Sequence, residues 1–113
     1  MVNDEALEAF GRIDVRTGTI VAVDPFPEAR KPAYKLTIDF GETIGRRRSS
    51  AQIVALYEPT ALIGTQVLGV VNFPKKRIAG FESEVLVLGV PDEAGNVVLL
   101  SPQRLVPNGG RMY

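Results

Sequence analysis

The sequence contains no cysteine, no histidine and no tryptophan. The lack of cysteine excludes disulfides and thiolate metal sites, and the lack of histidine excludes imidazole acid–base catalysis and histidine-based metal sites. No apolar run approaches the roughly 20 residues that a membrane-spanning helix needs. The N-terminus is acidic and polar, unlike a secretory signal, so we expect a soluble intracellular protein.

What is present is an ordinary globular composition, with 45% apolar and 23% charged residues over 113 positions. A chain of this length is expected to form one domain, residues 1–113, with a single modest core. The net charge of zero hides a segregation, because residues 30–48 hold six basic and two acidic residues while residues 1–28 hold six acidic and two basic ones. A neutral chain with basic clusters can bind a polyanion locally, although long-range steering is weak.

A short helix is predicted at the start of the chain, over residues 3–10. Asn3 can cap this helix and Gly11 is expected to end it. Leu7 and Phe10 are three residues apart and share one face of the helix, and we assign Phe10 to the core.

Most of the remaining chain is predicted to form strands separated by turns that contain glycine or proline. Gly18 predicts a bend or bulge within the first strand, and residues 85–88 are expected to form a buried strand. Residues 34–40 alternate, which places Leu36, Ile38 and Phe40 on one inward face. Strands are predicted over residues 13–24, 34–40, 46–53, 66–72, 83–90 and 97–101, with one helical turn over 58–64 and an irregular tail over 102–113.

This pattern predicts an all-β OB-type barrel of five strands with an N-terminal helix, a short helix between strands three and four, and a C-terminal hairpin and tail. A small sandwich is the alternative. Residues 85–90 and 97–100 are apolar on both strand faces, so something must cover their outer face. The N-terminal helix or the tail can do so, but we favour a second subunit in an isologous dimer. The predicted dimer interface comprises Val85, Val87, Val98 and Leu100.

Two basic triplets are the main candidate binding residues. A lone triplet is usually a solvated turn, but Arg46–Arg48 and Lys75–Arg77 lie at the ends of neighbouring predicted strands and can together follow a phosphodiester backbone. Nearby serine, asparagine and glutamine side chains can bond base edges or sugars, or else they cap turns. The predicted nucleic-acid contacts are Arg46, Arg47, Arg48, Ser50, Gln52, Asn72, Lys75, Lys76, Arg77 and Ser83.

Aromatic side chains near these triplets, Phe73, Phe81 and Tyr34, can stack on bases at ~1–3 kcal/mol each if exposed, or else they belong to the core. No catalytic group is recognised. Residues 41–46 lack the spacing of a phosphate-binding loop, and the serines at 49–50 have no histidine to activate them. We therefore expect neither an enzyme nor a cofactor or metal site.

The stretch NFPKKRIAGFESEVLVLG, residues 72–89, resembles the signature of the tRNA-binding domain that is appended to some methionyl-tRNA synthetases. Further segments at residues 13–20, 26–30, 49–53 and 83–89 are similar to the CsaA proteins, stand-alone chaperone-like bacterial members of that family. The signature positions shared with the family are Asn72, Lys76, Arg77, Gly80 and Ser83.

The resemblance implies an OB fold, a homodimer and a cytoplasmic location. It implies that tRNA binds the barrel face that carries the basic turn. It also implies binding of unfolded or preprotein polypeptides, linked to protein export through the Sec machinery, without insertion into the membrane. The alternative is a dedicated tRNA-binding module that assists aminoacylation or RNA handling.

Overall fold

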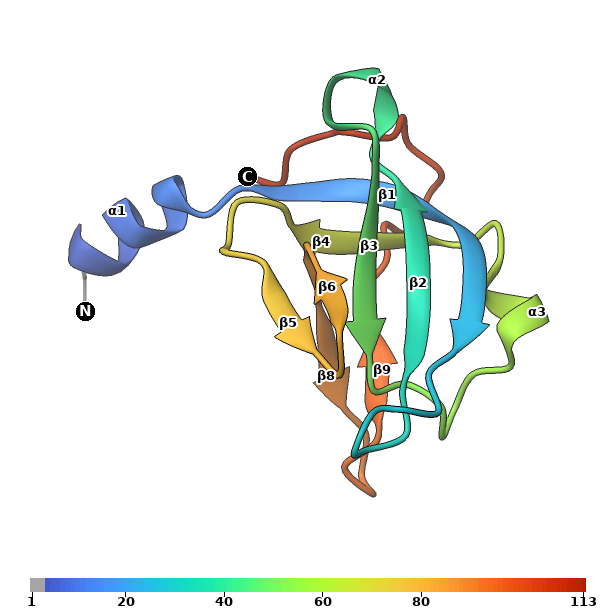
Figure 1. Ribbon diagram of the computed structural model, residues 1–113. Helices are drawn as coiled ribbons and strands as arrows, with labels where there is room; N and C mark the ends of the chain where they lie inside the picture. Colours follow the sequence, from blue (N-terminus) through green and yellow to red (C-terminus); the bar gives the residue numbers. More distant parts are fainter. Residues whose placement is uncertain (1–3) are drawn as a thin grey trace.

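A computed structural model of the protein describes residues 4–113 (Figure 1). A five-stranded antiparallel sheet in the order β3-β2-β1-β4-β7 curls into a nearly closed barrel, so the predicted OB-type fold is confirmed. Two small hairpins, β5–β6 and β8–β9, flank it. The elements are α1 (Asp4–Arg12), β1 (Val15–Pro25), β2 (Tyr34–Asp39), α2 (Gly41–Ile44), β3 (Arg46–Ala51), α3 (Pro59–Leu62), β4 (Gln66–Val70), β5 (Lys76–Ile78), β6 (Phe81–Ser83), β7 (Leu86–Val87), β8 (Gly89–Pro91) and β9 (Val97–Leu99).

The core lies inside the barrel and follows the predicted alternation of β2. Leu36, Ile38 and Phe40 are buried, while the residues between them are only partly covered. The hydroxyl of Ser49 is also buried, and it donates a hydrogen bond to the carbonyl of Val85 at 2.9 Å. This bond joins β3 to the segment that precedes β7, where the barrel closes.

Gly18 does not produce the predicted bend in β1. The register shift of β1 against β2 lies between Ile20 and Ala22 instead. At Gly18, an added Cβ would lie 2.6 Å from the Ile38 side chain and 2.8 Å from that of Phe40. Glycine is therefore required here because core side chains pack directly against the backbone of β1.

The predicted fifth strand over residues 83–90 is not continuous, and residues 85–88 do not form a buried strand. Val85 is buried, but Leu86 is 50% exposed. The chain changes partners along this stretch, because β7 pairs with β4 whereas β8 pairs with β9. Each short strand therefore covers a different part of the barrel.

The C-terminal tail is joined to β1 by backbone hydrogen bonds. The amide of Thr17 donates to Gly110 O at 3.0 Å, Gly109 N donates to Thr17 O at 2.8 Å, and Met112 N donates to Val15 O at 2.8 Å. These bonds lie along the part of β1 that precedes Thr19, where its pairing with β2 begins. The segment predicted as irregular thus pairs with the edge of the barrel.

Gln66 and Gly109 fix the path of this tail. The buried Gln66 side chain donates to Val106 O at 2.7 Å and accepts from Val106 N at 3.1 Å. Gly109 has a φ of +91°, and a Cβ there would lie 2.7 Å from Phe40 O. Only glycine satisfies both the left-handed backbone and the close approach.

The N-terminal helix α1 extends away from the barrel (Figure 1). It continues through Gly11 to Arg12, so glycine does not end it as predicted, and the predicted Asn3 cap lies outside the described residues. Phe10 is 44% exposed and not part of the core, and no residue of α1 is buried. Within residues 4–113, every helix is too short and too polar to cross a membrane.

Candidate functional site

The β5–β6 hairpin carries Lys76 and Arg77 of the second basic triplet and is closed by a two-residue turn. Ile78 pairs with Phe81, and Ala79 and Gly80 between them have φ values of +46° and +82°. Positive φ at both central positions is the type I′ geometry, whose twist matches that of the flanking strands. Gly80 fits this turn at no steric cost, as its place in the signature implied, whereas Ala79 occupies a strained conformation.

A groove of about 820 Å³, which we call the basic groove, runs between this hairpin and the loop after β1. Among the described residues, none of its four cationic side chains forms an ion pair or a side-chain hydrogen bond within the chain. Their charge is therefore available to an anionic ligand. The basic groove is lined by Arg30, Lys31, Lys76 and Arg77, by Ser50 and Gln52, and by Ala29, Ala33, Ile78 and Ala79.

A small satellite core holds the two walls of the basic groove together. Phe26 and Ala33, at the ends of the loop, are buried against Phe81 of the hairpin. The Phe26 and Phe81 rings meet edge-on with centroids 5.4 Å apart. This contact places Arg30 and Lys31 of the loop opposite the hairpin cations. Both residues belong to the basic excess of residues 30–48, but neither was predicted as a site residue.

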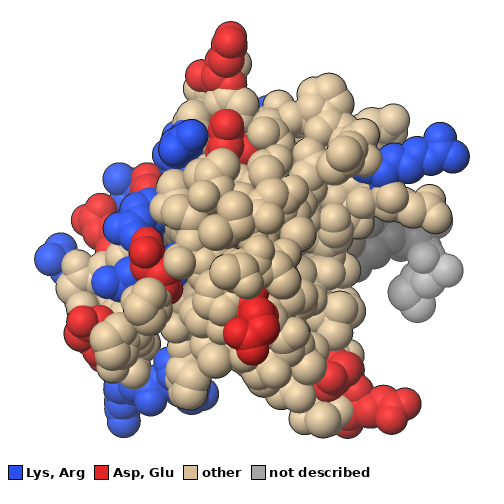
Figure 2. All heavy atoms as spheres, turned by 90° about the vertical axis from the view of Figure 1, so that its right-hand side faces the viewer, with Lys and Arg blue, Asp and Glu red and all other residues tan. Residues whose placement is uncertain are grey.

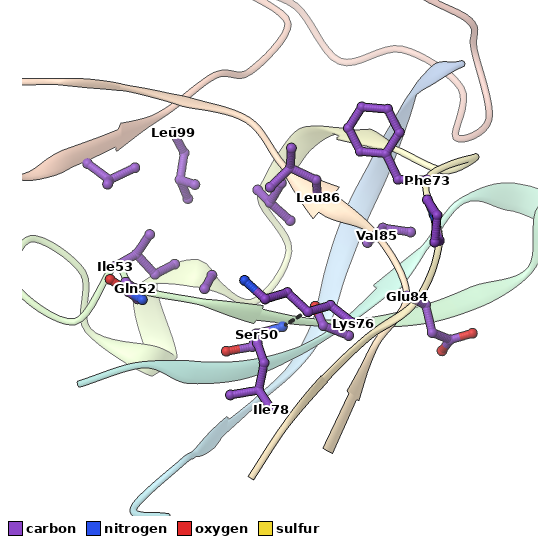
Figure 3. A pocket seen from close by; sticks show the side chains of 15 residues that line it. Ser50, Gln52, Ile53, Phe73, Lys76, Ile78, Glu84, Val85, Leu86 and Leu99 are labelled. Carbon is purple, nitrogen blue, oxygen red and sulfur yellow. Dashed lines mark hydrogen bonds between the residues drawn. The ribbon is translucent and has the colours of Figure 1, made fainter. Parts of the chain in front are cut away.

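A second, apolar cavity of about 380 Å³ adjoins the basic groove (Figure 3). Lys76 extends into the middle of this cavity, between Ser50 on one side and Leu86 on the other. Four residues line both spaces, so the cavity and the groove form one continuous surface. The shared residues are Ser50, Gln52, Lys76 and Ile78, and the apolar cavity is further lined by Ala51, Ile53, Phe73, Pro74, Ser83, Glu84, Val85, Leu86, Val87, Val97 and Leu99.

Cationic side chains also cover the outer face of the sheet beside the basic groove. The Lys35 ammonium lies 4.7 Å from the Phe26 ring centroid, and the Arg48 guanidinium lies 4.8 Å from that of Phe81. Arg48 also forms an ion pair with Asp24 at 3.7 Å. These contacts hold two further positive charges next to the groove, since cations are attracted to aromatic faces.

The structure does not bring the first triplet together. Side chains alternate along β3, so Arg47 faces away from its two neighbours, and its Nε donates to Ile44 O at 3.3 Å. Arg46 lies four residues from Ser50, which is ~13 Å along a strand. Of the three arginines, Arg48 alone lies beside the basic groove, where it packs on Phe81.

The second triplet lies closer to the predicted site. Lys76 lines both the groove and the cavity, and Arg77 lines the groove. Lys75 lies outside both and pairs with Glu82 at 3.9 Å. Two of the three positions are therefore free to contact a ligand.

Asn72 has a structural role in this molecule. Its side-chain nitrogen donates to Arg12 O at 2.8 Å, and its side-chain oxygen accepts from Asp14 N at 2.9 Å. Both ends of the amide are occupied by the junction between α1 and β1. The turn-capping interpretation therefore describes Asn72 better than contact with a base edge.

Of the other polar candidates, Ser83 has a structural role and Gln52 is available to a ligand. Ser83 is 9% exposed, and its Oγ accepts from Ser50 N at 3.0 Å, which ties β6 to β3. The Gln52 side chain is exposed and has no hydrogen-bond partner among the described residues. Gln52 is thus the polar side chain best placed to contact a ligand, and the half-buried Ser50 lies next to it.

The three aromatic candidates differ in exposure. Phe81 is 7% exposed and packs beneath cationic side chains, so its faces are occupied. Tyr34 donates its hydroxyl to Tyr57 O at 2.8 Å. Phe73 is 43% exposed and lines the apolar cavity, which leaves its ring accessible for stacking.

The residues predicted at a dimer interface are placed unevenly. Val85 lies in the barrel core, and Val87 and Leu100 are half-buried, whereas Val98 is 36% exposed. Leu86 and Val90, which were not among the predicted interface residues, are 50% and 49% exposed. The exposed apolar surface therefore comprises Val98, which was predicted, and two positions that were not, Leu86 and Val90.

Charged side chains are distributed asymmetrically over the molecule. Figure 2 shows Lys and Arg gathered along one side, together with several acidic residues, while the broad face toward the viewer is largely free of charge. Within residues 4–113, no group of acidic side chains is arranged to hold a metal ion. The geometry points to a binding surface for a large anion.

Residues 15–111 match the family described as "Putative tRNA binding domain". The chain belongs to the tRNA-binding domain family. It is 31% identical over 112 residues to a methionine–tRNA ligase of Porphyromonas gingivalis, of which it spans 16% of the length. The family resemblance predicted from residues 72–89 is thus confirmed.

Within the tRNA-binding domain family, the chain is similar to CsaA chaperones over its full length. The crystal structure of chaperone CsaA from Bacillus anthracis is 53% identical, with a TM-score of 0.90 and coverage of 100% of this chain and 99% of the other. CsaA chaperone protein from Picrophilus torridus is 47% identical, with a TM-score of 0.90 and full coverage of both chains.

Proposed function

We propose that the protein binds tRNA through the basic groove. The observation that carries this proposal is the convergence of four cations without intrachain partners, Arg30, Lys31, Lys76 and Arg77, on one groove. Successive phosphates along an RNA strand can neutralise such a row, and the released counterions favour binding. Membership of the tRNA-binding domain family supports tRNA as the anion.

The proposal is tested at Arg30 and Lys31. These residues line the basic groove from the loop after β1, and they lie outside the family signature. We expect the double variant Arg30→Ala with Lys31→Ala to bind fluorescently labelled tRNA ~10-fold more weakly, measured by anisotropy, because two phosphate contacts are lost. Arg104→Ala, an exposed arginine outside the groove, is the matched control. Unchanged affinity in the double variant would place the RNA elsewhere.

We further propose that the protein binds unfolded polypeptide, with the apolar cavity receiving apolar side chains. A concave apolar site with a polar rim suits such a ligand, and the full-length similarity to CsaA chaperones supports the role. Val97→Asp should abolish binding of a labelled unfolded polypeptide, because a carboxylate in the cavity cannot be desolvated. Val54→Asp, at an exposed position outside the cavity, should leave that binding intact.

The cellular role follows from this polypeptide binding. The protein is proposed to act in the cytoplasm as a homodimer that keeps preproteins unfolded for export through the Sec machinery. The similarity to CsaA chaperones supports the chaperone part of this role, and the export part is the expectation drawn from the family resemblance. Translocation of a purified preprotein into inverted membrane vesicles should be faster when the protein is added, and an unchanged rate would remove the export role.

The alternative is a tRNA-binding module that assists aminoacylation or RNA handling. The similarity to part of methionine–tRNA ligases favours it. In that case, adding the protein to a methionine–tRNA ligase that lacks such a domain should raise the aminoacylation rate at limiting tRNA. An unchanged rate would leave the chaperone role as the better account.

A further inference from the structure

The basic groove and the apolar cavity meet along four residues, which we call the shared strip. Strand β5 contributes Lys76 and Ile78 to this strip, and the end of β3 contributes Ser50 and the adjoining Gln52. A polymer that fills either space therefore lies against residues that also line the other space.

The shared strip is held in place by contacts on both of its sides. Lys76 is the direct partner of Ser83 in the β5–β6 ladder, and the Ser83 Oγ accepts from Ser50 N at 3.0 Å. The edge-on contact between Phe26 and Phe81, with ring centroids 5.4 Å apart, fixes the same hairpin against the loop after β1. Because the hairpin is tied to β3 and to this loop, the strip cannot widen to seat two polymers side by side.

Lys76 is the residue of the strip at which the two ligands have opposite requirements. Its side chain extends between Ser50 and Leu86 (Figure 3) and forms no ion pair among the described residues. A phosphate in the groove would pair with the Lys76 ammonium. An apolar segment in the cavity would cover that ammonium, and desolvating a charge that has no partner is costly.

The phosphate of a bound RNA meets the same difficulty as Lys76. A phosphate that pairs with Lys76 lies next to the mouth of the cavity, where apolar side chains of a polypeptide would replace part of its hydration. Loss of that hydration without new hydrogen bonds is unfavourable. RNA and apolar polypeptide therefore compete both for the surface of the shared strip and for the water that covers it.

We propose that tRNA and unfolded polypeptide exclude each other on one chain, so that binding of tRNA releases a bound polypeptide. The inference rests on the proposed binding of both ligands and adds how the two are coupled. Because coupling between two ligands is reciprocal, an excess of polypeptide also releases tRNA.

The exclusion is tested first by displacement on the native protein. The probe is a fluorescently labelled unfolded polypeptide without net charge, so that it does not itself bind tRNA through charge. At a free tRNA concentration about ten times its own Kd, the apparent Kd of the polypeptide should rise about 11-fold, because competition multiplies it by one plus that ratio. An unchanged apparent Kd would overturn the exclusion.

Counting the bound ligands gives an answer that does not depend on the number of chains in the particle. Sedimentation with separately labelled tRNA and polypeptide, both at saturation, measures how many of each are bound per chain. The sum of the two should not exceed one ligand per chain. A sum clearly above one would show both spaces filled at once and would overturn the exclusion.

The variant Lys76→Met tests the conflict at the shared strip, and the side chain is exposed, so the core is left intact. Affinity for tRNA should fall about threefold, because one of four phosphate contacts is lost. Affinity for the polypeptide should rise about threefold, because no ammonium has to be covered. Lys75→Met removes the same charge outside both spaces and should change either affinity less than about twofold.

The outcomes separate the exclusion from the proposed function. A native protein that holds tRNA and polypeptide together on each chain would overturn the exclusion and leave both binding activities standing. A Lys76→Met variant with unchanged or weaker polypeptide binding would overturn the conflict at Lys76. A native protein that does not bind one of the ligands would overturn the proposed binding of that ligand, and the exclusion with it.

Discussion

The two basic triplets have the same charge but different surroundings. Arg46–Arg48 lie on a six-residue strand of the main sheet, whereas Lys76 and Arg77 lie on the small β5–β6 hairpin beside it. On β3, alternation separates Arg47 from its neighbours and Arg48 is engaged with Phe81 and Asp24. On the hairpin, two cations remain without partners and meet two more from a loop. Charge in a sequence is available to a ligand only where the fold leaves the charged side chains unpaired and brings them together.

The largest expected difference between the triplets is in tRNA affinity. Lys76→Glu with Arg77→Glu should weaken tRNA binding by at least ~100-fold, because two attractive phosphate contacts become repulsive. Arg46→Glu with Arg47→Glu should weaken it by about threefold or less, since these side chains lie outside the groove. Anisotropy titrations at one salt concentration compare the pairs, and equal losses would remove the distinction between the triplets.

The salt dependence of tRNA binding measures how many phosphate contacts each basic triplet makes. Four groove cations predict a log–log slope of about −2.8 for single-stranded RNA regions. The alanine pair at Lys76 and Arg77 should reduce the slope to about −1.4, whereas the alanine pair at Arg46 and Arg47 should leave it unchanged. A slope that falls equally in both variants would mean that the two triplets contact phosphate alike.

Within the first triplet, Arg48 is expected to contribute to stability. Arg48→Ala should lower the free energy of unfolding by about 1 kcal/mol, because the contact with the Phe81 ring and the ion pair with Asp24 are lost. Arg46→Ala, which has no intrachain side-chain partner among the described residues, should change it by less than about 0.5 kcal/mol. Urea unfolding followed by circular dichroism measures both values.

The hairpin that carries the second triplet is expected to gain stability from a better turn residue. Ala79→Asn should raise the free energy of unfolding by about 0.5–1 kcal/mol, because asparagine tolerates positive φ better than alanine. A drop in stability would mean that position 79 makes a contact that asparagine disrupts.

Much of the barrel could be predicted because its strands follow from the local alternation of apolar and polar residues. The alternation of Leu36, Ile38 and Phe40 specifies an inward face without reference to any other segment. The pairing of the tail with β1 could not be predicted, because it depends on a contact between residues far apart in sequence, such as Thr17 and Gly110. The tail has no strand pattern of its own, and its proline and glycine content is typical of a loop.

The lining of the candidate groove was predicted in part for the same reason. Lys76 and Arg77 were found from the family signature and from their charge. Arg30 and Lys31 were missed as site residues because the burial of Phe26 against the hairpin, a tertiary contact, decides where their loop lies. Asn72 has the side-chain chemistry of a base contact, and only the structure shows that its amide is already bonded to backbone on both sides.

The attachment of the tail to β1 has a consequence for synthesis of the protein. Val15 of β1 is made well before Met112, which donates a hydrogen bond to its carbonyl. The edge of β1 therefore stays open until the tail has been made. A nascent chain of this protein is itself an unfinished fold with an exposed strand edge, which other polypeptides can pair with.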